Sequence, residues 1–114
     1  MEYKWTIFMA NLNPVTGSEQ RGTRPVIVVS DEIFNSVMPV VTVLPVTSLK
    51  EGRKVYPNEV LLNRGQAGVA QDSIILAHQV RTIAKERLSN KVGSLSDAGT
   101  REKVKGALKI HLNL

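Results

Sequence analysis

Short runs of apolar and β-branched residues, separated by prolines and glycines, fill most of this chain. They predict strands over residues 3–12, 26–30, 40–44, 58–62 and 74–83, and a further short strand over 88–93. The run over 26–30 is almost continuously apolar, which is typical of a buried strand. Pro14 and Pro45 are expected to end the first and third strands, because proline donates no hydrogen bond to a central ladder.

The last part of the chain changes to a helical period. From Ser96 onward one predicted helical face carries Thr100, Val104, Ala107, Leu108, His111 and Leu112. The opposite face is charged, and Ser96 is the expected N-cap. Gly99 and Gly106 each weaken such a helix by about 1 kcal/mol relative to alanine, so packing on the sheet must stabilise it. A single helical turn over 32–35, capped by Asp31, is also predicted.

These elements together predict a mainly β fold with a C-terminal helix. Short strands at close spacing and proline or glycine corners favour a small, strongly bent sheet or a partly open barrel. At 114 residues the chain is expected to form a single domain over residues 1–114, and its 42% hydrophobic content with few aromatic residues predicts an aliphatic core.

The location expected for this chain is the cytoplasm. No apolar run approaches the roughly 18 residues of a membrane span, and the N-terminus lacks the pattern of a signal peptide. The absence of cysteine excludes disulfides and thiolate metal sites. We therefore expect no association with membranes.

The polar stretch 17–25, with the sequence GSEQRGTRP, is the most distinctive part of the chain. Gly17 and Gly22 adopt positive φ at little cost, so the stretch predicts a compact loop that presents Glu19, Arg21 and Arg24. Guanidinium groups suit phosphate oxygens. Taken alone, however, a surface loop whose glutamate and arginines pair with each other is the more ordinary interpretation.

Three further features point toward nucleic acid. The formal net charge of +5 favours an anionic partner. Thr47 and Ser48 follow a proline corner, and Lys50, Arg53 and Lys54 form a basic loop. Each feature also has a structural explanation, because such hydroxyls often satisfy turns and such lysines are often simply solvated.

No standard catalytic set is present: there is no cysteine nucleophile, no metal-ligand spacing and no phosphate-binding glycine motif. His78 and His111 are interpreted as structural. RNA can nevertheless be cleaved without metal or histidine, because its ribose 2′-OH is an internal nucleophile. The protein then has to supply a proton acceptor and stabilise charge on phosphorus. Glu19, Arg24 and Thr47 have the chemistry for a proton acceptor, an electrostatic stabiliser and a hydrogen-bond donor respectively.

Five motifs in order resemble the MazF/PemK (Kid) toxin family over nearly the whole chain. They are Asn11–Pro14, the pair Gly17–Gln20 and Gly22–Pro25, Pro45–Ser48, Asp72–Ser73, and Gln79–Ile83. The resemblance implies an SH3-like or CcdB-like barrel, a homodimer, and the toxin of a type II toxin–antitoxin pair. It also implies a sequence-specific endoribonuclease that cleaves single-stranded RNA without metal or cofactor and leaves 2′,3′-cyclic phosphate and 5′-OH ends.

The same resemblance assigns residues. Arg24 and Thr47 match the principal catalytic pair of the family, and Glu19 matches an acidic position on which some members depend. The expected RNA-binding residues are Ser18, Gln20, Arg21, Thr23, Ser48, Lys50, Arg53, Lys54, Gln79 and Arg81. For Gln79 and Arg81 a structural role is equally open. The implied partner is a MazE-like antitoxin whose acidic tail blocks the RNA groove.

Two other functions stay open at this point. A CcdB-like toxin would share the fold but bind DNA gyrase without catalysis, and an inactive homologue would serve only as a regulatory dimer. Filled motif positions at Glu19, Arg24 and Thr47 favour the endoribonuclease. The N-terminal segment 1–5 departs from the family's usual start, and the loop over 49–56 does not reveal the RNA sequence that is cut.

Overall fold

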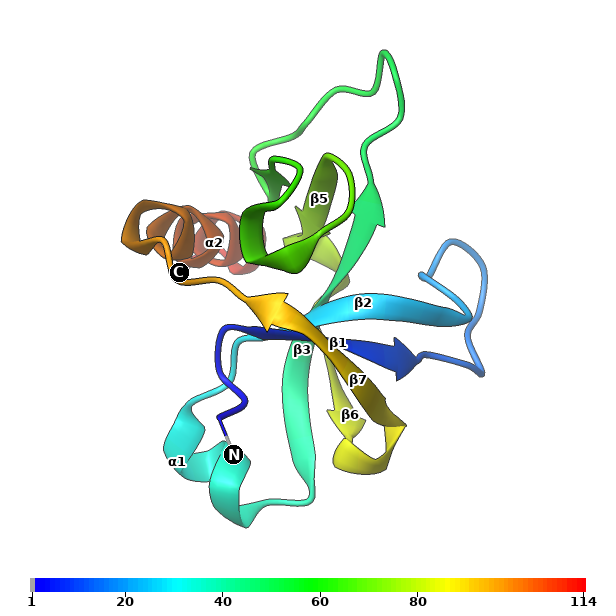
Figure 1. Ribbon diagram of the computed structural model, residues 1–114, viewed down its shortest axis with the longest axis vertical. Helices are drawn as coiled ribbons and strands as arrows, with labels where there is room; N and C mark the ends of the chain where they lie inside the picture. Colours follow the sequence, from blue (N-terminus) through cyan, green and yellow to red (C-terminus); the bar gives the residue numbers. More distant parts are fainter. Residues whose placement is uncertain (1) are drawn as a thin grey trace.

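The computed structural model describes residues 2–114 and contains seven strands, two α-helices and three short 3-10 helices (Figure 1). The strands are β1 (Thr6–Asn11), β2 (Thr23–Val28), β3 (Val40–Ser48), β4 (Glu59–Leu62), β5 (Ser73–Leu76), β6 (Arg81–Ala84) and β7 (Leu88–Ser94). The helices are α1 (Glu32–Val37), η1 (Gln66–Gly68), η2 (Ala77–Gln79), η3 (Lys85–Arg87) and α2 (Ala98–Leu112).

The sheet is antiparallel, with the strand order β4-β5-β3-β2-β1-β7, and β6 pairs with β3 off this path. Within the described residues β4 and β7 do not pair, so the sheet bends strongly without closing. The predicted mainly β fold with a C-terminal helix is confirmed. No helix within residues 2–114 is long and apolar enough to cross a membrane.

The strand β3 organises the molecule, because three other strands pair with successive parts of it (Figure 1). The prediction that Pro45 ends this strand is wrong. Pro45 lies inside β3, in the gap between the β6 pairing, which ends at Val43, and the β5 pairing, which begins at Val46. A missing N–H removes no ladder bond there, so the strand continues to Ser48.

Two other predicted strand boundaries are corrected. The run 74–83 is divided into β5 and β6 by η2, because these strands pair with opposite ends of β3 and the chain must turn between them. The strand β2 begins at Thr23, not at Val26, since its pairing with β1 extends through Arg24 opposite Ala10. Arg24 therefore lies on a strand and not in the preceding loop.

The helix caps are set by aspartates. Asp31 caps α1 as predicted, and its side chain accepts a hydrogen bond from the Ile33 N–H at 2.8 Å. The predicted cap Ser96 is wrong, because the Asp97 carboxylate accepts from the Thr100 N–H at 2.8 Å. The buried face of α2 contains Thr100, Val104 and Ala107, whereas His111 and Leu112, predicted for the same face, are exposed.

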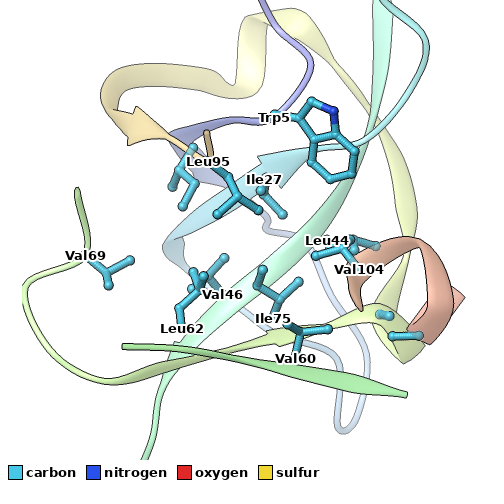
Figure 2. Packing of buried hydrophobic residues seen from close by; sticks show 13 residues of the cluster. Trp5, Ile27, Leu44, Val46, Val60, Leu62, Val69, Ile75, Leu95 and Val104 are labelled. Atoms are coloured by element: carbon cyan, nitrogen blue, oxygen red, sulfur yellow. The ribbon is translucent and has the colours of Figure 1, made fainter. Parts of the chain in front are cut away.

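Two aliphatic clusters form the core. Alternation along β1 sends Ile7 into a cluster that α2 covers through Val104, and sends Phe8 into a second cluster. Figure 2 shows the first cluster, in which Trp5 packs with aliphatic side chains from the sheet and the helix. The core fixes β1, β2 and β3 relative to one another, and these strands carry the candidate site.

Candidate active site

Arg24 and Thr47 line one cleft between neighbouring strands. The pairing of β2 with β3 ends at Val26 opposite Pro45; Arg24 lies two residues before Val26, and Thr47 lies two residues after Pro45. Beyond this point β3 continues beside β5, which lies along its other edge. A cleft of about 250 Å³ opens at this point, and both side chains line it. Strand register therefore brings together two residues that are distant in the sequence.

The polar groups of Arg24 and Thr47 are available to a ligand. Arg24 donates from Nε to the Arg21 carbonyl at 3.0 Å, and this hydrogen bond orients the guanidinium group. Among residues 2–114, the two Nη groups of Arg24 and the Thr47 hydroxyl have no hydrogen-bond partner. A planar cation and a hydroxyl in one cleft suit the oxygens of a phosphate group.

The third expected catalytic residue, Glu19, lies elsewhere. Its carboxylate is exposed and accepts a hydrogen bond from the Thr16 N–H at 3.1 Å. It lines a second cleft of about 520 Å³, together with His78 and Arg81. The structure thus brings Arg24 and Thr47 together and leaves Glu19 apart from them.

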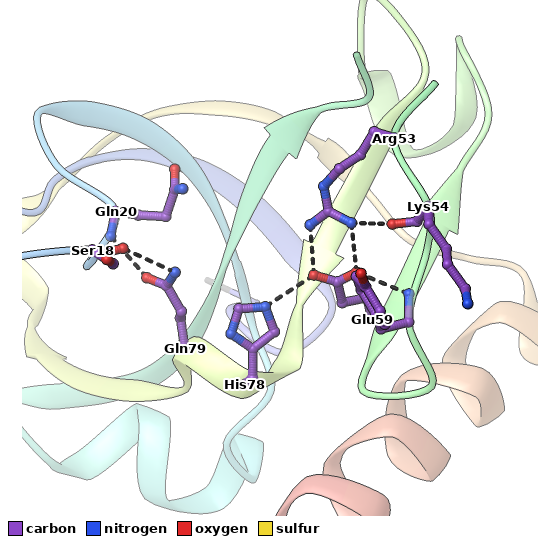
Figure 3. A network of polar contacts seen from close by, with 8 residues as sticks. Ser18, Gln20, Arg53, Lys54, Glu59, His78 and Gln79 are labelled. Carbon is purple, nitrogen blue, oxygen red and sulfur yellow. Dashed lines mark hydrogen bonds and ion pairs between the residues drawn. The ribbon is translucent and has the colours of Figure 1, made fainter. Parts of the chain in front are cut away.

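Gln79 and Arg81 hold the loop between β1 and β2, and Figure 3 shows the Gln79 contacts. Gln79 accepts from the Gln20 N–H at 2.8 Å and donates to the Ser18 carbonyl at 3.4 Å. Arg81 donates to the Leu12 carbonyl at 3.2 Å. Gln79 and Arg81 could have bound RNA or supported the fold, and the contacts in the structure are of the second kind.

The other predicted RNA-binding residues of this loop lie in different surroundings. Ser18 and Gln20 line the second cleft. Arg21 is exposed and donates to the Gly17 carbonyl, so it stabilises the loop from within. Thr23 is exposed at the first position of β2. Gly17 and Gly22 have φ of 58° and 76°, as the loop prediction requires.

In the basic loop after β3, some of the charged side chains form contacts within the protein and others do not. Arg53 donates from Nη1 and Nη2 to the Glu59 carboxylate, at 2.9 and 2.7 Å (Figure 3). Lys54 lies 5.6 Å from the centre of the Tyr56 ring. Lys50 is exposed and forms no ion pair within the described residues. Lys50 and Lys54 therefore remain available to a ligand, whereas the Arg53 guanidinium is engaged.

Glu59 is a polar centre that the sequence analysis missed. Its side chain is only 2% exposed, and it also accepts from the Tyr56 N–H at 3.0 Å and bonds to His78 Nε2 at 2.9 Å (Figure 3). The Arg53 hydrogen bonds, aided by Tyr56 and His78, lower the pKa of Glu59 to about 2 although burial opposes this shift. One sequence feature could have indicated Glu59: it is an acidic residue at the start of an apolar strand, and it follows an arginine by six residues.

The two histidines lie near each other. His78 belongs to η2, and not to the middle of a strand as predicted. Its ring centre is 6.3 Å from that of His111, in an edge-on arrangement. In residues 2–114, no three side chains of histidine, cysteine, aspartate or glutamate are grouped so that they could hold a metal ion.

Sequence comparison relates the chain to known toxins. The family described as "PemK-like, MazF-like toxin of type II toxin-antitoxin system" matches residues 3–112. "Endoribonuclease EndoA" of Bacillus subtilis is 40% identical over 95% of this chain and 91% of its own length. "Endoribonuclease MazF" of Staphylococcus saprophyticus is 37% identical over 95% of this chain and 88% of its own length.

Solved structures agree with this relationship. MazF from Deinococcus radiodurans superposes with a TM-score of 0.80 at 29% identity, covering 97% of this chain and 96% of that one. A MazE–MazF complex from the same organism gives a TM-score of 0.71 at 25% identity, covering 97% and 94%. A mycobacterial endoribonuclease in complex with its cognate antitoxin shares the fold, with a TM-score of 0.81 at 19% identity and coverage of 100% and 97%.

Proposed function

The chain belongs to the PemK-like, MazF-like toxins of type II toxin–antitoxin systems, and from this premise we propose that it is an endoribonuclease toxin cleaving single-stranded RNA at short sequences. The observation that carries the proposal is the cleft where Arg24 and Thr47 present unpaired donors. Cleavage of RNA requires such donors where charge develops on the phosphate.

The proposed reaction is an internal transesterification. The ribose 2′-oxygen loses its proton and bonds to phosphorus, while the bond from phosphorus to the 5′-oxygen breaks and that oxygen gains a proton. The products carry a 2′,3′-cyclic phosphate and a 5′-OH. Because the substrate supplies its own nucleophile, orientation accounts for much of the rate. DNA lacks the 2′-OH and does not react in this way.

Arg24 and Thr47 stabilise the phosphorane in this scheme. The role of the Arg24 guanidinium is electrostatic and not proton transfer, because a guanidinium is a permanent cation that only donates hydrogen bonds. It contacts the equatorial oxygens, and the Thr47 hydroxyl donates a further hydrogen bond to one of them. Both residues sit on strands, which hold them in fixed positions.

Glu19 is proposed as the proton acceptor after a movement of the loop between β1 and β2. In the structure this carboxylate faces the second cleft, so it reaches the 2′-OH only if the loop turns toward Arg24. Such a turn breaks the two hydrogen bonds that Gln79 makes to Gln20 and Ser18. Gly17 and Gly22, both at positive φ, are its hinges. A Glu19→Gln variant, which keeps the shape of the side chain and removes the proton acceptor, is expected to lower kcat by about 10²–10⁴. An unchanged kcat would remove Glu19 from the mechanism.

Cleavage of a long single-stranded RNA in EDTA tests the proposed function. We expect 5′-OH and 2′,3′-cyclic phosphate ends, and no cleavage at a site that carries a single 2′-deoxyribose. Lys105→Ala removes one positive charge from the exposed face of α2 and serves as the matched control for Arg24→Ala. A requirement for Mg²⁺, or products with 5′-phosphates, would contradict the proposal.

The family supports a proposal for the partners and the location of the chain. We propose that the chain acts as a homodimer in the cytoplasm and is inhibited by a MazE-like antitoxin with an acidic tail, which the net charge of +5 would attract. Light scattering should give twice the 12.5 kDa chain mass. The alternative of a gyrase-binding toxin is not favoured, because the similar curated proteins are named endoribonucleases. Inhibition of gyrase supercoiling without RNA cleavage would reverse this ranking.

A further inference from the structure

The cleft that holds Arg24 and Thr47 has a second wall, which the proposed reaction does not use. The segment 68–71 forms this wall together with β7. The apolar side chains that line the cleft are Met9, Pro25, Val46, Val69, Ala70 and Val92. Its volume of about 250 Å³ is just below the roughly 300–1,000 Å³ of pockets that hold drug-sized ligands, so it suits a single flat ring.

The wall is held rigidly by two glycines that touch through their backbones. A Cβ on Gly68 would lie 2.4 Å from the Val92 carbonyl oxygen, and one on Gly93 would lie 2.3 Å from that of Ala67. η1, which leads into this segment, is tied to α2, because Gln66 donates to the Thr100 hydroxyl at 2.9 Å. A wall braced at two points gives the cleft a fixed shape, and a preorganised cleft discriminates between ligands.

One amide stands at the rim of this apolar cleft. Gln71 is exposed and donates from Nε2 to the Ser48 hydroxyl at 3.0 Å. The Ser73 hydroxyl donates to the Gln71 backbone carbonyl at 2.8 Å, which fixes the residue's main chain. Within residues 2–114 the Gln71 Oε1 has no partner, and one amide N–H also stays unused. The rim therefore presents a donor and an acceptor side by side, which is the pattern that reads the edge of a base.

We propose that this cleft receives one unstacked nucleobase adjacent to the scissile phosphate, and that Gln71 determines which base is accepted. The inference rests on the proposed endoribonuclease function. The apolar lining takes the faces of the ring, and the Gln71 amide pairs with its polar edge. Arg24 and Thr47 then hold the phosphate attached to the same nucleotide. Recognition and chemistry share one cleft, so a base that does not fit displaces the phosphate from its donors.

The test compares the cut sites of the wild type with those of Gln71→Ala and Ala70→Trp in a randomised RNA pool. For Gln71→Ala we expect preference at a single position beside the cut to fall by about tenfold, the range of one lost base contact. For Ala70→Trp, whose exposed site tolerates a larger side chain, we expect the indole to fill the cleft and raise KM by at least about tenfold. Thermal unfolding checks that both variants are folded.

The control is Glu102→Ala, which removes a solvated side chain from the outward face of α2. Its cut sites should match those of the wild type. Cut-site preferences that stay within twofold of the wild type in Gln71→Ala, with KM unchanged in Ala70→Trp, would overturn the base-binding role. A wild-type protein that cleaves no RNA would instead overturn the proposed function itself.

Discussion

Arg24 and Thr47 line the same cleft, and the two Nη groups of Arg24 and the Thr47 hydroxyl have no hydrogen-bond partner among the described residues. Neighbouring residues of similar type do find partners: Arg21 bonds to Gly17, Arg53 to Glu59 and Arg81 to Leu12. This difference in hydrogen bonding distinguishes arginines that stabilise the loops from side chains whose polar groups are available to a ligand. It is the residue-level basis for placing the reaction at Arg24 and Thr47.

Substitution of Thr47 tests the role of its hydroxyl. Thr47→Val keeps the shape of the side chain and removes the donor, so kcat should fall by about 10²–10³, as for other lost transition-state donors. Thr47→Ser keeps the hydroxyl and should retain most of the activity. Single-turnover cleavage of a short RNA provides the measurement. Equal rates for the valine and serine variants would exclude a role for the hydroxyl.

The buried carboxylate of Glu59 makes stability depend on pH. Its pKa is lowered from an ordinary 4.5 to about 2 by Arg53 and its other donors, so this contribution is full above pH 4.5 and disappears as the pH falls toward 2. The shift corresponds to about 3 kcal/mol at neutral pH. Urea unfolding should show that Glu59→Gln destabilises the protein at pH 7 and much less at pH 2.5. A loss that does not depend on pH would contradict the ion-pair explanation.

At the scale of elements, the fold depends on close backbone packing between η1 and β7. Gly93→Ala should destabilise the protein by about 1–3 kcal/mol, because the new Cβ would meet the Ala67 carbonyl. Gly106 in α2 provides a matched control, since no atom lies within 4 Å of its added Cβ. Gly106→Ala should stabilise the protein by about 0.5–1 kcal/mol through helix propensity. Denaturant unfolding of both variants gives the comparison, and equal effects would contradict this packing.

Local sequence patterns predicted the elements well where side-chain period and burial agree. The largely apolar run over 3–12 predicted β1, which spans Thr6–Asn11, and the Asp31 cap predicted α1. The patterns failed where distant pairing decides the outcome. Pro45 is tolerated only because β6 and β5 leave a gap beside it. The run 74–83 contains no glycine or proline to mark the turn at η2, which arises because β5 and β6 pair with opposite ends of β3.

The candidate site was predictable only in part, for the same reason. Nothing local to Arg24 or Thr47 indicates that they face one cleft, because their meeting depends on the register of β2 against β3. The family resemblance singled out both residues, and the ends of β2 and β3 explain why they line the same cleft. The position of Glu19 in another cleft depends on the loop contacts of Gln79, which a linear sequence does not reveal. Gln71 carries no signal at all in the sequence.

At the scale of the whole molecule, positive charge should govern how RNA is held. The net charge is +5, and Arg24, Lys50 and Lys54 are cations free to meet phosphates. Three such contacts with a single strand predict that log K falls against log salt with a slope of about −2. Lys50→Ala should make that slope shallower by about 0.7. Fluorescence anisotropy with a non-cleavable 2′-deoxy oligonucleotide measures it, and affinity insensitive to salt would contradict this picture.

The central claim is that Arg24 and Thr47 act as one unit on a single phosphodiester. The most direct test is single-turnover cleavage of one RNA by Arg24→Ala, Thr47→Val and the double variant, with folding verified for each. If both residues stabilise the same phosphorane, the double variant should be about as slow as the slower single variant, because groups that act together have non-additive effects. Rate losses that multiply in the double variant, or full activity in either single variant, would contradict the account.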